Sequence, residues 1–167
     1  MALIDGMLQE LEQEAQTTRR LFERIPENQL SWRPHEKART LGELALHVAM
    51  VPGSVAELVA GADTVPVPTF TDPSPKTASE LIPALNESIA KAKKSLGGMS
   101  DAKLMTTWRM VRGEEEVFAI PRVAFLRSIM LNHWYHHRGQ LSVYLRELDV
   151  PLPSIYGPSA DENPFAR

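Results

Sequence analysis

Cysteine is absent from all 167 residues of the chain. This excludes disulfide bonds, thiolate metal ligands and a cysteine nucleophile, so any thiol chemistry would need a thiol supplied from outside. We also find no apolar run that we expect to be long enough to cross a bilayer. The N-terminal stretch MALIDGMLQELEQEAQ carries acids where a secretory signal needs basic residues. We therefore expect a cytoplasmic protein without a membrane partner.

An excess of positive charge is missing as well. The 18 lysines and arginines against 21 aspartates and glutamates give a net charge of −3, which provides no electrostatic attraction for nucleic acid. The hydrophobic content of 43% is ordinary for a globular protein. The length suits one domain, and no internal repeat or change in composition divides it. We expect a single domain over residues 1–167.

Four stretches have the apolar spacing of amphipathic helices. The capping box TLGE from Thr40 and the capping box TASE from Thr77 predict the starts of the second and third helices. Pro52, inside the second helix, predicts a kink or break. Pro121 is expected at the first position of the last helix, where its missing N–H costs nothing. The predicted helices cover residues 3–24, 40–61, 77–97 and 121–148.

Two segments between these helices lack helical spacing. The loop ADTVPVPTFTDPSPK is rich in proline, which argues against a strand in a central sheet. In TTWRMVRGEEEVFAI, apolar residues flank the polar tip RGEE, which predicts a short hairpin or an irregular crossover before the last helix. With four helices and little strand, the sequence predicts an all-α fold of the four-helix-bundle type.

Three of the five histidines crowd into the stretch NHWYHHRGQ, as His133, His136 and His137. At 100° per residue, His133 and His137 lie about 40° apart on the apolar side of the predicted helix. The same geometry places Tyr135 and Arg138 outward and His136 at the margin. Two imidazoles at positions i and i+4 can chelate one metal ion.

His47, in LGELALHVAM, points inward from the second helix. An inward histidine can also be a core residue that is hydrogen-bonded to backbone or to another histidine. Three of them on two core helices favour a metal site, whereas His35 lies in a polar loop and is expected at the surface. Gln140 could orient a ligand or line the pocket, or be a core amide. His136 could hydrogen-bond at the edge of the site or make a surface or dimer contact.

With these motifs the chain resembles the DinB/YfiT-like superfamily. The resemblance rests on LSWRP, TLGELALHV, HWYHHRGQL and the tail VPLPSIYGPSADE. It implies a four-helix bundle in a variant up-and-down arrangement, and one divalent metal ion held by His47, His133 and His137. It also implies a homodimer, which many members form. Some members are transferases or isomerases that use low-molecular-weight thiols, and many have no known reaction.

An all-histidine site limits the metal and its chemistry. Three neutral imidazoles favour zinc or nickel over calcium or magnesium and leave at least one coordination position open. Such an ion could activate water for hydrolysis, or hold an incoming thiol as thiolate. No acid stands at a helical offset from the histidines, so we identify no general base. We expect a metal-dependent transferase acting with a low-molecular-weight thiol on a small-molecule substrate. The alternatives are a metal-dependent hydrolase and a non-catalytic metal-binding stress-response dimer.

Overall fold

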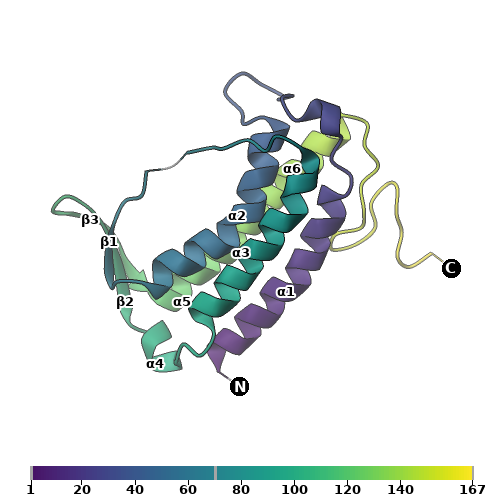
Figure 1. Ribbon diagram of the computed structural model, residues 1–167. Helices are drawn as coiled ribbons and strands as arrows, with labels where there is room; N and C mark the ends of the chain where they lie inside the picture. Colours follow the sequence, from purple (N-terminus) through teal and green to yellow (C-terminus); the bar gives the residue numbers. More distant parts are fainter. Residues whose placement is uncertain (1, 70, 167) are drawn as a thin grey trace.

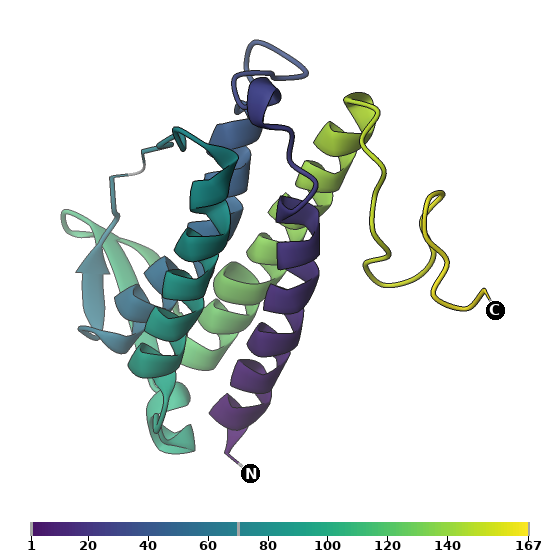
Figure 2. The same ribbon diagram turned by 45° about the vertical axis from the view of Figure 1, so that its right-hand side comes forward.

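Four long helical segments run alongside one another in this computed structural model, which describes residues 2–69 and 71–166 (Figures 1 and 2). Their apolar faces meet in one hydrophobic core. Three short helical turns, η1, η2 and α4, lie between them. The long segments are α1 (Leu3–Phe22), α2 (Leu41–Ala60), α3 (Leu81–Leu96) and the series α5 (Arg122–Phe125), η3 (Leu126–Asn132) and α6 (His133–Glu147). The short turns are Glu27–Gln29, Ala78–Glu80 and Asp101–Leu104.

A small sheet of three strands makes the all-α prediction wrong in part. Strands β2 (Thr107–Arg112) and β3 (Glu115–Pro121) form the antiparallel hairpin that the sequence predicts. Gly113 takes a positive φ in the turn between them, as tight hairpins require. Strand β1 (Thr64–Pro66) comes from the proline-rich loop and pairs in parallel with β2. Because β1 lies at the edge of the sheet, Pro66 is tolerated there without an N–H to donate.

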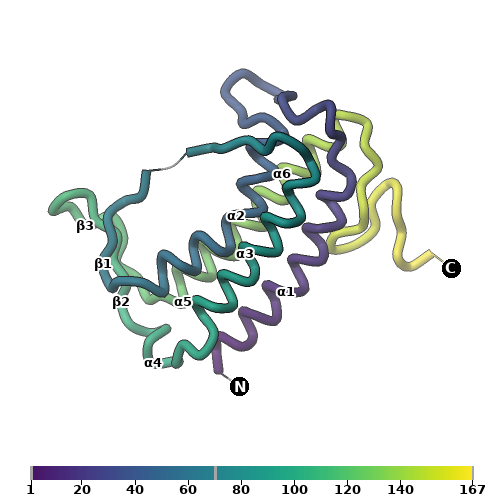
Figure 3. Tube along the Cα trace, viewed as in Figure 1, coloured from purple at the N-terminus to yellow at the C-terminus, as the bar shows by residue number. Residues whose placement is uncertain are grey.

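Helix α2 begins with the predicted capping box. The amide of Glu43 donates to Oγ1 of Thr40 over 3.2 Å, and the amide of Thr40 donates to Oε2 of Glu43 over 2.7 Å. Of the kink or break predicted at Pro52, the break is absent, because the helix continues from Leu41 to Ala60 with the proline inside it. The backbone of α2 does bend along its length (Figures 1 and 3). Packing against α3 and α6 supports α2 through this point.

Length and composition alone would allow α2 to cross a membrane, contrary to our expectation that no stretch is long enough. In the structure, half of this apolar stretch is buried inside the protein. Its neighbours there are α3 and α6. A helix that is apolar on most sides is ordinary for the centre of a helical core.

The starts of the last two long segments differ from the prediction. Thr77 makes no side-chain cap; a short 3₁₀ turn follows it, and α3 begins at Leu81. Pro83 therefore falls in the first turn of α3, where a missing N–H costs little. Pro121 precedes α5 as its N-cap residue instead of occupying the first helical position. The final segment is also irregular, since residues Leu126–Asn132 form a π-helical turn directly before His133.

The buried side of α6 is rotated by about one residue from the predicted side. Arg138, expected to point outward, is only 1% exposed and bonds to Glu14 of α1. Tyr135, also expected outward, is half-buried and donates to Glu10. The fully buried positions of α6 are Trp134, Arg138, Leu141 and Leu145. The histidines consequently lie at the margin of the core, within reach of solvent.

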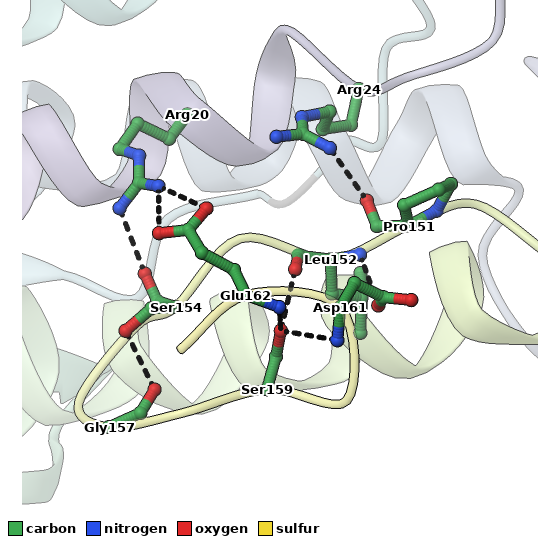
Figure 4. A network of polar contacts seen from close by, with 9 residues as sticks. All are labelled: Arg20, Arg24, Pro151, Leu152, Ser154, Gly157, Ser159, Asp161 and Glu162. Atoms are coloured by element: carbon green, nitrogen blue, oxygen red, sulfur yellow. Dashed lines mark hydrogen bonds and ion pairs between the residues drawn. The ribbon is translucent and has the colours of Figure 1, made fainter. Parts of the chain in front are cut away.

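Residues 148–166, which follow α6, form no helix or strand and lie on the opposite side of the helices from the sheet (Figures 1 and 3). Two arginines hold this tail, Arg20 in the last turn of α1 and Arg24 just after the helix (Figure 4). Arg20 donates to both carboxylate oxygens of Glu162, at 2.5 and 2.6 Å, and Arg24 donates to the carbonyl of Pro151 over 3.3 Å. Within the tail, the Ser159 hydroxyl accepts from the amides of Asp161 and Glu162.

Candidate metal centre

Helices α2 and α6 bring three histidines together. His47 lies in the N-terminal half of α2, while His133 is the first residue of α6 and His137 lies one turn further on. One ring nitrogen from each lies within 4.8 Å of the other two. The Nε2 atoms of His47 and His133 are 3.2 Å apart, and the ring centre of His137 lies 4.5 and 4.3 Å from those of His47 and His133. The clustering that the sequence predicts is thus confirmed.

Gln140 fixes the orientation of one ring. Its Oε1 atom lies 2.7 Å from Nδ1 of His137, and an amide oxygen can only accept, so Nδ1 carries the proton. Nε2 of His137 then keeps its lone pair. Metal-binding histidines are usually oriented in this way, by donating the second ring N–H to an oxygen. Gln140 itself is exposed, which excludes the core-amide alternative.

Burial keeps the three rings neutral. Burial, together with the nearby His137 and the charge of Arg39, lowers the pKa of His47 to about 4. Burial also lowers the pKa of His137 to about 4, although the bond to Gln140 opposes the shift. The pKa of His133 is lowered by burial and by His136 and Arg39. Neutral rings have the free lone pairs that metal coordination requires.

The donor set fits a divalent ion of the zinc or nickel type. Two nitrogens bound tetrahedrally to one zinc ion at 2.0–2.1 Å would lie roughly 3.3 Å apart. The 3.2 Å between Nε2 of His47 and Nε2 of His133 matches this separation. The same two atoms could also share a proton in a direct hydrogen bond, but the third ring facing them gives the group the arrangement of a chelate.

Two charged residues that the sequence analysis missed lie beside the cluster. The positive charge of Arg39 lowers the pKa of all three histidines, and the negative charge of Asp72 raises that of His47. The two are paired, with Nε of Arg39 2.7 Å from Oδ1 of Asp72. Arg39 directly precedes the cap of α2, which could have indicated its place near the end of that helix. Nothing in the sequence places the Asp72 loop there.

The other two histidines differ in position. His136 is exposed, and its ring centre lies 5.0 Å from that of His137, a position that agrees both with a role at the edge of the site and with a surface contact. His35 is exposed in its loop, as expected, and accepts at Nδ1 from the amide of Lys37.

Two hollows in the surface lie away from the histidines. One, of about 400 Å³, lies between α1 and α3 and includes Glu12 and Lys93. The other, of about 160 Å³, lies between α2 and α3 beside Ser88. Access to the metal centre therefore comes from the partial exposure of His47 and His133 at the margin of the core.

Comparison with known proteins identifies the family. The family model described as the DinB superfamily matches residues 10–141, a span that contains all three histidines. The chain belongs to the DinB superfamily. This DinB protein is 25% identical to the uncharacterized protein YrdA of Bacillus subtilis strain 168, over 95% of this chain and 91% of that one.

Two solved structures share the fold of this DinB protein. A DinB-like protein from Bacillus cereus ATCC 10987 matches with a TM-score of 0.72 and 23% identity, over 92% of this chain and 97% of that one. The DinB-like protein YjoA of Bacillus subtilis matches with a TM-score of 0.66 and 20% identity, over 90% and 97% of the two chains. At these identities the likeness shows the fold alone.

Proposed function

We propose that this DinB protein is a metal-dependent transferase that joins a low-molecular-weight thiol to an electrophilic small molecule. His47, His133 and His137 would hold the ion, which we expect to be zinc or nickel. One observation carries the proposal: three neutral imidazoles converge at a partly exposed place, with the guanidinium of Arg39 as their charged neighbour.

The histidines supply no negative charge, so a divalent ion held by them keeps its full charge. When bound, such an ion lowers the pKa of a coordinating thiol and holds it as the thiolate. Gln140 fixes the ring of His137, and Arg39 offers a donor for the carboxylates that small cellular thiols carry. The chain contributes no thiol of its own, since it has no cysteine.

The reaction would be a displacement at carbon. The thiol sulfur forms a bond to the electrophilic carbon while the bond to the leaving group breaks, and the leaving group departs with the electron pair. The thiol proton passes to solvent. No protein base is needed, which suits a site whose neighbouring carboxylate, Asp72, is already paired with Arg39.

Hydrolysis is the second candidate, because Asp72 is an acid beside His47. We rank hydrolysis below thiol transfer, because this carboxylate is already held by the guanidinium of Arg39. The partial exposure of His47 and His133 favours both enzymatic candidates over a purely structural ion, whose site would be closed.

Turnover with a panel of thiols tests the proposal. The metal-stripped protein, reloaded with zinc or nickel, is incubated with bacillithiol, mycothiol, glutathione or coenzyme A and a chlorinated nitrobenzene, and chloride release is followed. We expect one thiol to react faster with the loaded protein than with the stripped protein or with loaded His133→Ala. That thiol should also raise the melting temperature of the loaded protein. Equal rates in all three preparations would reject the transferase.

A further inference from the structure

A proline inside α2 leaves one carbonyl of that helix without its usual partner. Pro52 has no N–H, so the carbonyl of Val48, four residues earlier, receives no bond from within the helix. Val48 is fully buried, and water therefore cannot take the place of the missing donor. A buried carbonyl in this position needs a partner from another element.

Trp134 of α6 provides that partner. Its indole Nε1 donates to the carbonyl of Val48 over 2.8 Å, and the side chain is fully buried. An indole N–H can only donate, and the orphaned carbonyl can only accept, so each satisfies the other. The bond joins α2 to α6 at one defined point.

This bond stands directly beside the metal centre. Val48 follows His47 in α2, and Trp134 follows His133 in α6. The two contacts, indole to carbonyl and His47 to His133, link residues that are 86 positions apart in both cases. The two contacts therefore join neighbouring residues of the same two helices. A shift of α6 along or around α2 that breaks the indole bond would also change the distance between Nε2 of His47 and Nε2 of His133.

The π-helical turn makes such a fixed point necessary. Residues Leu126–Asn132 end immediately before His133, and a π-helical turn changes the rotation of everything that follows it. The direction in which His133 and His137 point is thus set by contacts of α6 itself. The indole bond joins the residues that directly follow two of the ligands, Val48 after His47 and Trp134 after His133.

We propose that Trp134 is a positioning residue of the three-histidine site: its bond to the carbonyl that Pro52 leaves free sets the separation of His47 and His133. The inference builds on the metal site of the proposed function, and it adds two residues that do not touch the ion. Loss of the bond should loosen the site without removing a ligand. Residues that orient metal ligands typically change the affinity roughly 10–100-fold.

A matched control exists on the other side of α2. The amide of Gly53 donates to the hydroxyl of Ser88 on α3 over 2.8 Å, and this hydroxyl donates to the carbonyl of Met50 over 3.2 Å. Ser88→Ala therefore breaks a buried link at the same irregularity of α2, but toward α3 and away from the histidines. It separates a general loss of stability from a loss of positioning.

The experiment compares Trp134→Phe, Pro52→Ala and Ser88→Ala in the full chain. Phenylalanine keeps an aromatic ring without the N–H, while alanine at position 52 restores an amide that draws the Val48 carbonyl back into α2. Cobalt(II) affinity is measured by competition with a coloured chelator, the ligand geometry by the visible absorption of bound cobalt, and folding by thermal unfolding. We expect Trp134→Phe to weaken cobalt binding roughly 10–100-fold and to change the cobalt spectrum. Pro52→Ala should change both in the same direction but to a smaller extent. Ser88→Ala should retain the affinity and the spectrum of the wild type.

A folded Trp134→Phe protein with wild-type affinity and spectrum would overturn the proposal, as would equal losses in Ser88→Ala. If Trp134→Phe does not fold, Pro52→Ala decides by the same criteria, since alanine favours the helix. If wild-type protein binds no cobalt, zinc or nickel, the proposed function fails. Ring ¹⁵N chemical shifts of His47 and His133 in the metal-free proteins then test positioning alone: a change in Trp134→Phe but not in Ser88→Ala supports it, and unchanged shifts reject it.

Discussion

At the scale of single residues, each histidine of the metal centre has different surroundings. His137 is buried and oriented by Gln140, His133 and His47 are half-buried and face each other, and His136 is exposed. The chain spacing predicts the three converging residues because i and i+4 positions share a helix face. Arg39 and Asp72 could not be predicted, since a contact between an end of α2 and an irregular loop follows no periodicity.

Alanine substitutions should separate ligands from bystanders. His133→Ala and His137→Ala should each abolish tight binding of zinc or nickel, because two remaining imidazoles no longer form the chelate. His136→Ala should have a smaller effect and His35→Ala none. Metal titration calorimetry of the four variants checks this. A variant without His137 that still binds as tightly as wild type would contradict the assignment.

The stability of the metal-stripped protein should depend on pH through the same residues. In the unfolded chain a histidine binds its proton near pH 6.5, whereas burial lowers the pKa of folded His47 and His137 to about 4. Between these values the unfolded state binds more protons, so the free energy of unfolding falls as the pH is lowered from about 6.5 toward 4. Urea unfolding at several pH values measures it. His47→Gln should flatten this dependence, and an equally steep curve for that variant would exclude His47 as a cause.

At the scale of elements, the position of α6 between α1 and α2 determines the site. The long helices could be predicted from their apolar periodicity, and the hairpin from its polar tip. The orientation of α6 could not, because Arg138 is charged and looks like a surface residue in the sequence. In the structure its guanidinium is buried, 2.5 Å from Oε2 of Glu14, and it stacks over the ring of Tyr135 at 5.2 Å. The edge strand β1 was missed for a related reason, since its prolines are tolerated only at an edge.

The link from α6 to α1 should be costly to remove. Arg138→Ala leaves the carboxylate of Glu14, only 14% exposed, without its cationic partner and with the Tyr156 hydroxyl as a remaining donor. The loss of one member of a buried pair typically costs about 3–5 kcal/mol. Arg127→Ala is the matched control. Arg127 pairs with Glu10, which like Glu14 belongs to α1. The side chain of Arg127 is 50% exposed, so loss of this pair should cost about 0–1 kcal/mol. Denaturant unfolding gives both values, and a similar cost for the two variants would contradict the role assigned to Arg138.

At the scale of the whole molecule, the two additions to the helices lie on opposite sides of them (Figure 2). The sheet covers one end of α2 and α5, held by the buried Arg122, which donates to the carbonyl of Val59 and to Asp63. The tail lies along α1 (Figure 4). The homodimer that the family resemblance implies stays a prediction. The histidines lie where α2 meets the start of α6, and His47 and His133 are partly exposed there.

Removal of the tail should therefore lower stability without weakening metal binding. A chain ending at Val150 loses the contacts of Arg20 with Glu162, of Arg146 with Asp161, and of Arg138 with Tyr156. Two of these are surface ion pairs, each of which contributes little to stability. Loss of the Tyr156 contact leaves the guanidinium of Arg138 with Glu14 as its acidic partner. The melting temperature should therefore fall while the protein stays folded.

In the described part of the chain no hydrogen bond joins the tail to His47, His133 or His137. The zinc affinity of the truncated protein should therefore stay within about twofold of that of the full chain, well short of the losses typical of residues that orient metal ligands. Full-length protein carrying Glu162→Gln shows how much of the thermal effect comes from one ion pair. A large loss of zinc affinity on truncation, at a temperature where both proteins are folded, would mean that the tail supports the metal centre after all.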